Sequence, residues 1–298
     1  MKNFGQLWAL VLAAEGSERE ASSLLGYVMN RAARTAHRER VWAVVTQQHR
    51  RQLKGPLWFL PASNFIVLPE PGSTTFGIIM GLLRILERDP AARILVLPAS
   101  HDVRNEKPLM RSLRYAAAHT IVRPDDLFIL GVEPEADDLD FPGIVVGRDD
   151  RRGAFEVEQL IGNSSETPSR AVHERRLLWN TGILAGSAWS LLRLIEGRVP
   201  DIIAQVQAVV RGTNSEAEAE LNAHLLGLDF HRHVLPGNER YLSVLPVPRC
   251  GWSDVTASER GNAPLRLTVD SEADAQIRGA SKMRPPLFSW SAFDQELP

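Results

Sequence analysis

The chain of 298 residues contains a single cysteine, Cys250, and cannot build an intrachain disulfide framework. A lone cysteine fits a reducing compartment, so we expect a cytoplasmic protein in which Cys250 is buried and inert. The alternative is a reactive thiol beside a site, because Cys250 directly precedes Gly251. The N-terminal apolar run, Leu7 to Ala14, is too short to span a bilayer. We interpret it as a buried parallel strand rather than a signal peptide, because a helical segment follows.

A strong charge of either sign is also missing. The net charge of −2 leaves no electrostatic footprint for nucleic acid or an anionic membrane, so we expect neither partner. The hydrophobic content of 44% and charged content of 23% are typical of a soluble globular protein. No internal repeat is present. The length fits one large α/β domain over residues 1–260, followed by a short polar tail over 261–298.

Short apolar runs alternate with helical segments in the first half of the chain. The expected strands are Leu7–Ala14, Val41–Thr46, Phe65–Leu68, Ile94–Leu97 and Leu127–Leu130. Helices are expected between them at about 18–38, 75–88 and 105–119. This alternation predicts a mixed, mostly parallel Rossmann-like sheet flanked by helices. Ligands bind such sheets beyond the carboxyl ends of the strands, which places residues 13–19, 70–75 and 98–102 on one rim.

The second half is expected to add further β structure and then helices. Strands are predicted at Gly143–Gly147, Phe155–Ile161 and Val244–Val247, and helices at about 187–196, 200–211 and 215–226.

Two segments carry the signals for chemistry. One is Gly251-Trp252-Ser253-Asp254-Val255, which follows the last apolar run. Its glycine leaves space beside the backbone, its tryptophan offers a flat apolar surface, and its aspartate offers an oxygen ligand. The turn from Ala13 to Ser17 is rich in small residues and can offer backbone N–H groups to a phosphate. That turn lacks the spacing of a dinucleotide fingerprint or a P-loop, so a generic strand-to-helix turn is the alternative.

The GWSDV segment resembles the same element of mannose-1-phosphate guanylyltransferase-like sugar-phosphate nucleotidyltransferases. Further similarities follow in that family's order: residues 13–19 resemble its GGxGTRL loop, 68–75 its LEPxGRNTAPA segment, 94–101 its LVLPADH strand and 178–184 its LWNSGMF segment. The collinear order carries the resemblance better than any single motif. It implies the nucleotide-diphospho-sugar transferase type of α/β fold, without the family's C-terminal β-helix.

The resemblance implies a nucleotidyltransferase that joins a nucleoside triphosphate, with GTP favoured, to a sugar-1-phosphate, with mannose-1-phosphate favoured, and releases pyrophosphate. A homo-oligomer is compatible with it. The implied nucleotide-binding residues are Ala13, Ala14, Gly16, Ser17, Glu70, Pro71, Gly72, Thr75 and Ser100. The implied sugar-binding residues are Gly143, Asn180 and Gly182. Arg19 and Asp254 are the implied catalytic residues, and Asp254 with Asp102 would hold Mg²⁺.

The chain departs from the family where charge matters most. Glu18 replaces an arginine, Ser100 replaces the aspartate that is a principal magnesium ligand, and Asn163 replaces a lysine that contacts the sugar phosphate. A serine hydroxyl is a poor substitute for a carboxylate on Mg²⁺. One hypothesis is therefore an active enzyme with rearranged groups, in which Arg19 and Asp102 take over. The alternative is a catalytically impaired relative that acts as a nucleotide or sugar-phosphate binding or interaction protein.

Overall fold

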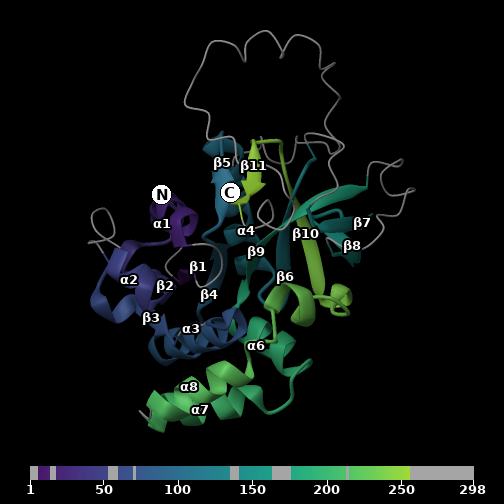
Figure 1. The fold of residues 1–298 in the computed structure, drawn as a ribbon. Coiled ribbons are helices and arrows are strands. Elements are labelled where there is room, and N and C mark those ends of the chain that lie inside the picture. Colours follow the sequence, from purple (N-terminus) through teal and green to yellow (C-terminus); the bar gives the residue numbers. More distant parts are fainter. Residues whose placement is uncertain are drawn as a thin grey trace.

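The computed structural model describes residues 6–13, 18–52, 60–69, 72–134, 141–162, 176–212 and 215–255, with only the backbone for 18–23, 48, 51 and 52. These residues form a nine-stranded mixed sheet with helices on both faces (Figure 1). The strand order is β3-β2-β1-β4-β9-β6-β10-β8-β7. The predicted tail over 261–298 lies outside the described residues.

The first half of the chain supplies a parallel portion of the sheet. Its strands are β1 (Leu7–Ala13), β2 (Val41–Thr46), β3 (Phe65–Leu68) and β4 (Arg93–Pro98). Every side chain of β1 is buried, and they alternate between two cores, so that Leu10 lies in one core and Val11 in the other. Burial on both faces explains why these strands are continuous apolar runs in the sequence.

The remaining strands make the sheet mixed rather than mostly parallel. They are β6 (Leu127–Val132), β7 (Gly143–Asp149), β8 (Phe155–Ile161), β9 (Leu177–Ser187) and β10 (Leu242–Val247). Strand β9 runs antiparallel to both β4 and β6, and β7 pairs with both β8 and β9. Strands β9, β6, β10, β8 and β7 therefore close into a ring. This corrects the prediction of a mostly parallel Rossmann-like sheet: the α/β class and the mixed sheet hold, but only β1 to β4 and the β6–β10 pair are parallel.

Helices cover the two faces unequally. Helices α1 (Glu18–Ala33) and α4 (Glu106–Val122) pack on one face, and α3 (Thr74–Arg88) and α6 (Ala188–Glu196) pack on the other. Helices α7 (Ile202–Gly212) and α8 (Ser215–His224) form a further layer outside α3 and α6 (Figure 1). The other helical elements are short: α2 (Gln47–Gln52), the 3-10 turns Arg38–Arg40, Ala62–Asn64 and Glu239–Tyr241, and the π-helical turn η4 (Phe230–Val234).

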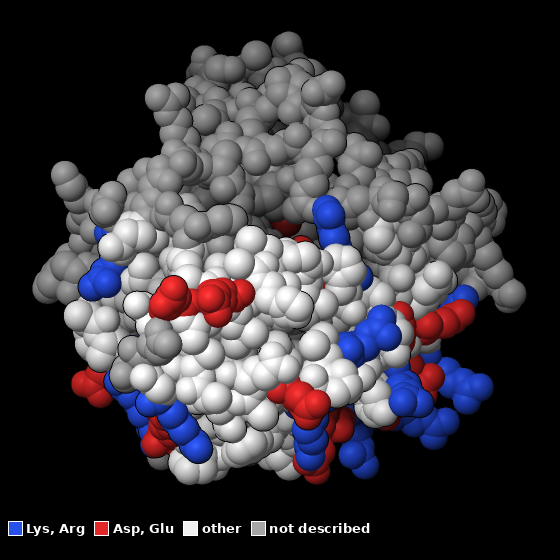
Figure 2. Space-filling model, turned by 60° about the horizontal axis from the view of Figure 1, so that its bottom comes forward, with Lys and Arg blue, Asp and Glu red and all other residues white. Residues whose placement is uncertain are grey.

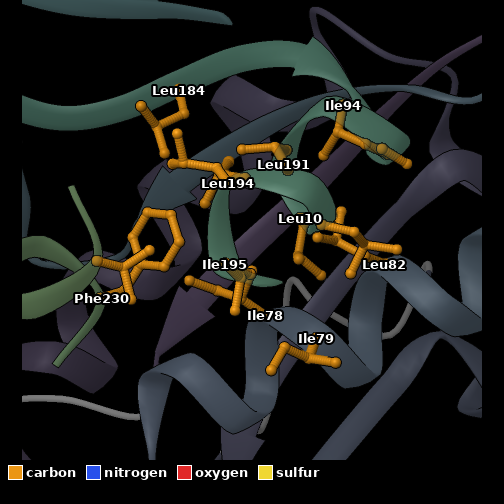
Figure 3. Close-up of a cluster of buried hydrophobic side chains, with 14 of the residues drawn as sticks. Leu10, Ile78, Ile79, Leu82, Ile94, Leu184, Leu191, Leu194, Ile195 and Phe230 are labelled. Atoms are coloured by element: carbon orange, nitrogen blue, oxygen red, sulfur yellow. The ribbon is translucent and has the colours of Figure 1, made fainter. Parts of the chain in front are cut away.

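The core under α3 joins segments that are far apart in the sequence. Figure 3 shows Leu10 of β1, Ile78 of α3, Leu184 of β9, Ile195 of α6 and Phe230 of η4 in one cluster. All five are buried almost completely. This cluster fixes η4 against the sheet, which positions the residue that follows Phe230.

The outer surface near α7 and α8 shows no continuous field of one charge. In Figure 2 the acidic and basic side chains of the described residues lie in small groups around a broad uncharged area. No helix among the described residues is long and apolar enough to cross a membrane.

Candidate functional site

A two-stranded ribbon stands beyond the carboxyl end of β4. Strands β5 (His101–Val103) and β11 (Trp252–Asp254) pair antiparallel, with Asp254 opposite His101 and Ser253 opposite Asp102. The N–H of Val255 donates to the carbonyl of Ser100 at 3.1 Å. The structure therefore brings Ser100, His101 and Asp254 together, although about 150 residues separate them in the chain.

The same register separates the two carboxylates predicted to share one magnesium ion. Neighbouring residues of a strand point to opposite faces, and Asp102 is one residue away from the position opposite Asp254. Asp102 is exposed, whereas Asp254 is half-buried. The structure thus gives no support to Asp102 and Asp254 as a pair of ligands, because the ribbon geometry turns them apart.

Of the two ribbon carboxylates, Asp254 is the one that could hold a magnesium ion beside Ser100. Among the residues that the structure describes, no group of three or more His, Cys, Asp or Glu side chains is arranged to hold a metal ion. Mg²⁺ is usually bound by one or two carboxylates together with water and substrate phosphates, rather than by a cage of protein ligands. One half-buried carboxylate beside Ser100 fits that minimal arrangement.

His101 is a buried histidine within the ribbon. Its ring meets Trp252 edge-on, with 5.3 Å between the ring centroids. Burial lowers the pKa of His101 to about 4, while Asp254 acts in the opposite direction and the nearby Arg31 adds to the lowering. The imidazole is therefore neutral at neutral pH and does not supply a positive charge to the site. Arg31 is itself buried and paired with Glu106, with 2.6 Å between Nη2 and Oε1.

Asn180 and Gly182 lie at the same end of the sheet. Leu184 of β9 pairs with Val96 of β4, so the antiparallel register continues Gly182 toward Pro98 at the end of β4. The Asn180 Oδ1 accepts a hydrogen bond from the Gly182 N–H at 2.8 Å, and Gly182 has a φ of +66°. We call the residues gathered here, Ser100, His101, Asn180, Gly182 and Asp254, the carboxyl-end rim.

Three other predicted ligand residues are built into the fold. Ala13 is buried at the end of β1. Thr75 is fully buried and its hydroxyl donates to the carbonyl of Leu228 at 2.6 Å, so it anchors α3 and is not presented to a nucleotide. Gly143 lies in β7 and packs against Leu177, whose Cδ1 would lie 2.9 Å from a Cβ atom at this position.

Several predicted residues cannot be placed at the site. Gly72 is half-buried just before α3. Ala14, Gly16, Ser17, Glu70 and Pro71, the side chains of Glu18 and Arg19, and Asn163 lie outside the described residues.

Two features of the site were not predicted as such. Glu133 follows β6, is buried, and lies 3.8 Å from the Nε of Arg249, which follows β10. His231 of η4 lies against Gly182. His231 lies outside every motif that carries the resemblance, so the sequence did not signal it. Cys250 is buried, as predicted.

The fold defines the class of protein first. A structure described as a mannose-1-phosphate geranyltransferase from Thermus thermophilus aligns with a TM-score of 0.70 and 20% identity, covering 87% of this chain and 80% of that one. A mannose-6-phosphate isomerase structure from Helicobacter pylori aligns with a TM-score of 0.63 and 13% identity, covering 84% of this chain and 100% of that one. These likenesses establish a shared α/β fold of the nucleotide-sugar transferase type.

The curated relatives narrow that class. A mannose-1-phosphate guanylyltransferase from Salmonella muenchen is 24% identical over 203 residues, covering 65% of this chain and 42% of the relative. A putative mannose-1-phosphate guanylyltransferase from Vibrio cholerae is 22% identical over 242 residues, covering 78% of this chain and 48% of the relative. The chain thus spans less than half the length of the relatives it matches, and no family model matches it. The chain is a divergent relative of the mannose-1-phosphate guanylyltransferase-like family, as its motif order predicted.

Proposed function

We propose that this protein is a sugar-phosphate nucleotidyltransferase, with GTP and mannose-1-phosphate as its favoured substrates. In this reaction a phosphate oxygen of the sugar-1-phosphate attacks the α-phosphate of the triphosphate, and pyrophosphate leaves. Such chemistry depends on positioning and on neutralising the charge of the phosphates.

One observation carries the proposal: the ribbon places Asp254 opposite His101 and beside Ser100 at the carboxyl end of β4. Open α/β sheets bind ligands at this end of their strands. Asn180 and Gly182 lie at the same end, on β9. The two most specific sequence matches, GWSDV and LWNTGIL, therefore converge on one rim although they come from separate parts of the chain.

The residues of the carboxyl-end rim suit different parts of the substrates. The Oδ1 atom of Asn180 accepts a hydrogen bond from Gly182, and the NH₂ group of the same amide can donate to a sugar hydroxyl. Gly182 allows close approach of the backbone because it carries no Cβ atom. Asp254 would hold Mg²⁺, which supplies neutralisation of phosphate charge when it is bound.

Ser100 favours a second candidate function, a nucleotide or sugar-phosphate binding protein without turnover. Ser100 occupies the position at which the resembled family has an aspartate, and Asp102 does not face Asp254 across the ribbon. A site with one carboxylate would bind phosphorylated ligands but stabilise the transition state poorly.

Pyrophosphate release from GTP and mannose-1-phosphate with Mg²⁺ tests the first function. Other nucleotide and sugar-1-phosphate pairs extend the assay to the base and the sugar. Calorimetry with the same ligands tests binding independently of turnover. Nucleotide binding without pyrophosphate release from any pair would reject the transferase and establish the binding protein.

A further inference from the structure

His231 lies directly against Gly182 on the carboxyl-end rim. A Cβ atom on Gly182 would lie 2.8 Å from Cε1, 3.2 Å from Nε2 and 3.3 Å from Nδ1 of His231. All three nearest atoms belong to one imidazole, so the ring packs on the α-carbon of the glycine. Any larger residue at position 182 would displace the ring.

The position of His231 is fixed by the fold. The preceding residue, Phe230, is buried in the core with Leu184 and Ile195 (Figure 3). Asp229 caps the π-helical turn by accepting from the N–H of Arg232 at 2.7 Å. A side chain held by a packed and capped turn is already ordered before a ligand binds. Binding then costs little further side-chain entropy, which favours such a residue as a ligand contact.

The imidazole of His231 has unused hydrogen-bonding capacity. Its Nδ1 atom is buried and has no hydrogen-bond partner among the described residues. Most buried polar atoms are paired, so an unpaired one beside a candidate site points to a ligand. Because Gly182 belongs to the carboxyl-end rim, this contact places the ring of His231 at the same rim.

We propose that His231 is a binding residue for the phosphate of the sugar-1-phosphate, donating an imidazole N–H to a phosphate oxygen beside Gly182. This inference rests on the proposed function, which places the sugar-1-phosphate at Asn180 and Gly182. A binding residue of this kind would compensate for a missing cation, because Asn163 occupies the position at which the resembled family has a lysine that contacts the sugar phosphate. Hydrogen bonds from an imidazole to a charged phosphate are stronger than neutral ones and partly replace the lost cation.

Two substitutions separate the hydrogen bond from the packing. His231→Phe keeps a flat ring against Gly182 and removes both ring nitrogens, whereas His231→Gln keeps a donor. We expect His231→Phe to raise the Kd for mannose-1-phosphate by about tenfold or more and to leave the Kd for GTP unchanged. His231→Gln should recover part of that loss. His224→Gln, on the exposed side of α8, is the matched control and should bind both ligands as the original protein does.

The ring signals of His231 in NMR spectra give a direct test on the intact protein. Mannose-1-phosphate and inorganic phosphate should both shift these signals, and mannose alone should not. A shift with mannose alone, or unchanged mannose-1-phosphate binding by His231→Phe, would overturn the inference. If no nucleotide and sugar pair is turned over but phosphate still shifts the His231 signals, the transferase fails and this inference stands. If pyrophosphate is released but the His231 signals do not shift with phosphate, the transferase function stands and the role of His231 is rejected.

Discussion

The two carboxylates of the ribbon differ in what surrounds them. Asp254 lies opposite the buried His101 and next to the segment that bonds Ser100, whereas Asp102 is exposed and lies opposite Ser253. A carboxylate acts on a bound phosphate or metal only when it faces the ligand. We therefore assign the functional charge of the ribbon to Asp254.

This assignment predicts unequal effects of two matched substitutions. Asp254→Asn should lower pyrophosphate release by about 100-fold or more, because it removes the ribbon carboxylate that would hold Mg²⁺ beside Ser100. Asp102→Asn should change the rate by no more than about threefold, as expected for an exposed residue outside the site. The measurement is kcat/KM at saturating Mg²⁺, with circular dichroism to check that both variants fold. Equal losses in the two variants would contradict the register argument.

The place of a single residue is predictable from the sequence where a motif itself fixes its surroundings. The resemblance predicted that Ser100 and Asp254 belong to one site, and the ribbon brings these two residues together. The burial of Thr75, which was predicted to bind the nucleotide, has no local signal, because its hydrogen-bond partner Leu228 is distant in the chain. His231 has no local signal either, because its contact with Gly182 depends on how η4 packs against β9.

At the scale of elements, continuous apolar runs were the most reliable signal. The strands Val41–Thr46, Phe65–Leu68 and Phe155–Ile161 have the predicted limits. No strand was predicted over β9, because the polar Asn180 and Thr181 interrupt its apolar pattern. The structure explains the interruption: the hydroxyl of Thr181 donates to the carbonyl of Leu130, and the β6–β9 register shifts at this point.

The close approach of α3 to the sheet depends on a glycine. A Cβ atom on Gly77 would lie 2.5 Å from Cγ1 of Val44 in β2, a β-branched side chain with little freedom to move. Gly77→Ala should therefore lower the free energy of unfolding by about 1–3 kcal/mol, despite the better helix propensity of alanine. Gly212→Ala is the matched control, because the Cβ position at the end of α7 has no atom within 4 Å. Urea unfolding measures both, and equal stabilities of the two variants would show that α3 can shift to accommodate the methyl group.

At the scale of the whole molecule, the two halves of the chain are interleaved in one sheet. Strand β9 lies between β4 and β6, and β10 lies between β6 and β8. The sequence predicted most of these strands but not their order, because the order is set by long-range pairing rather than by local pattern. The rim depends on this interleaving, since Asn180 and Gly182 reach the end of β4 only through β9.

The interleaving predicts that the described fold unfolds as one cooperative unit. Without β9, both β4 and β6 would lose an antiparallel neighbour, and the buried edges of both strands would expose unpaired backbone groups. Urea transitions followed by far-UV circular dichroism and by tryptophan fluorescence should therefore coincide, since Trp8 and Trp42 lie in the first half and Trp179 and Trp252 in the second. A fragment of residues 1–134 should show no cooperative transition of its own. Two separate transitions, or cooperative unfolding of that fragment, would mean that the first four strands are stable without the strand that completes the site.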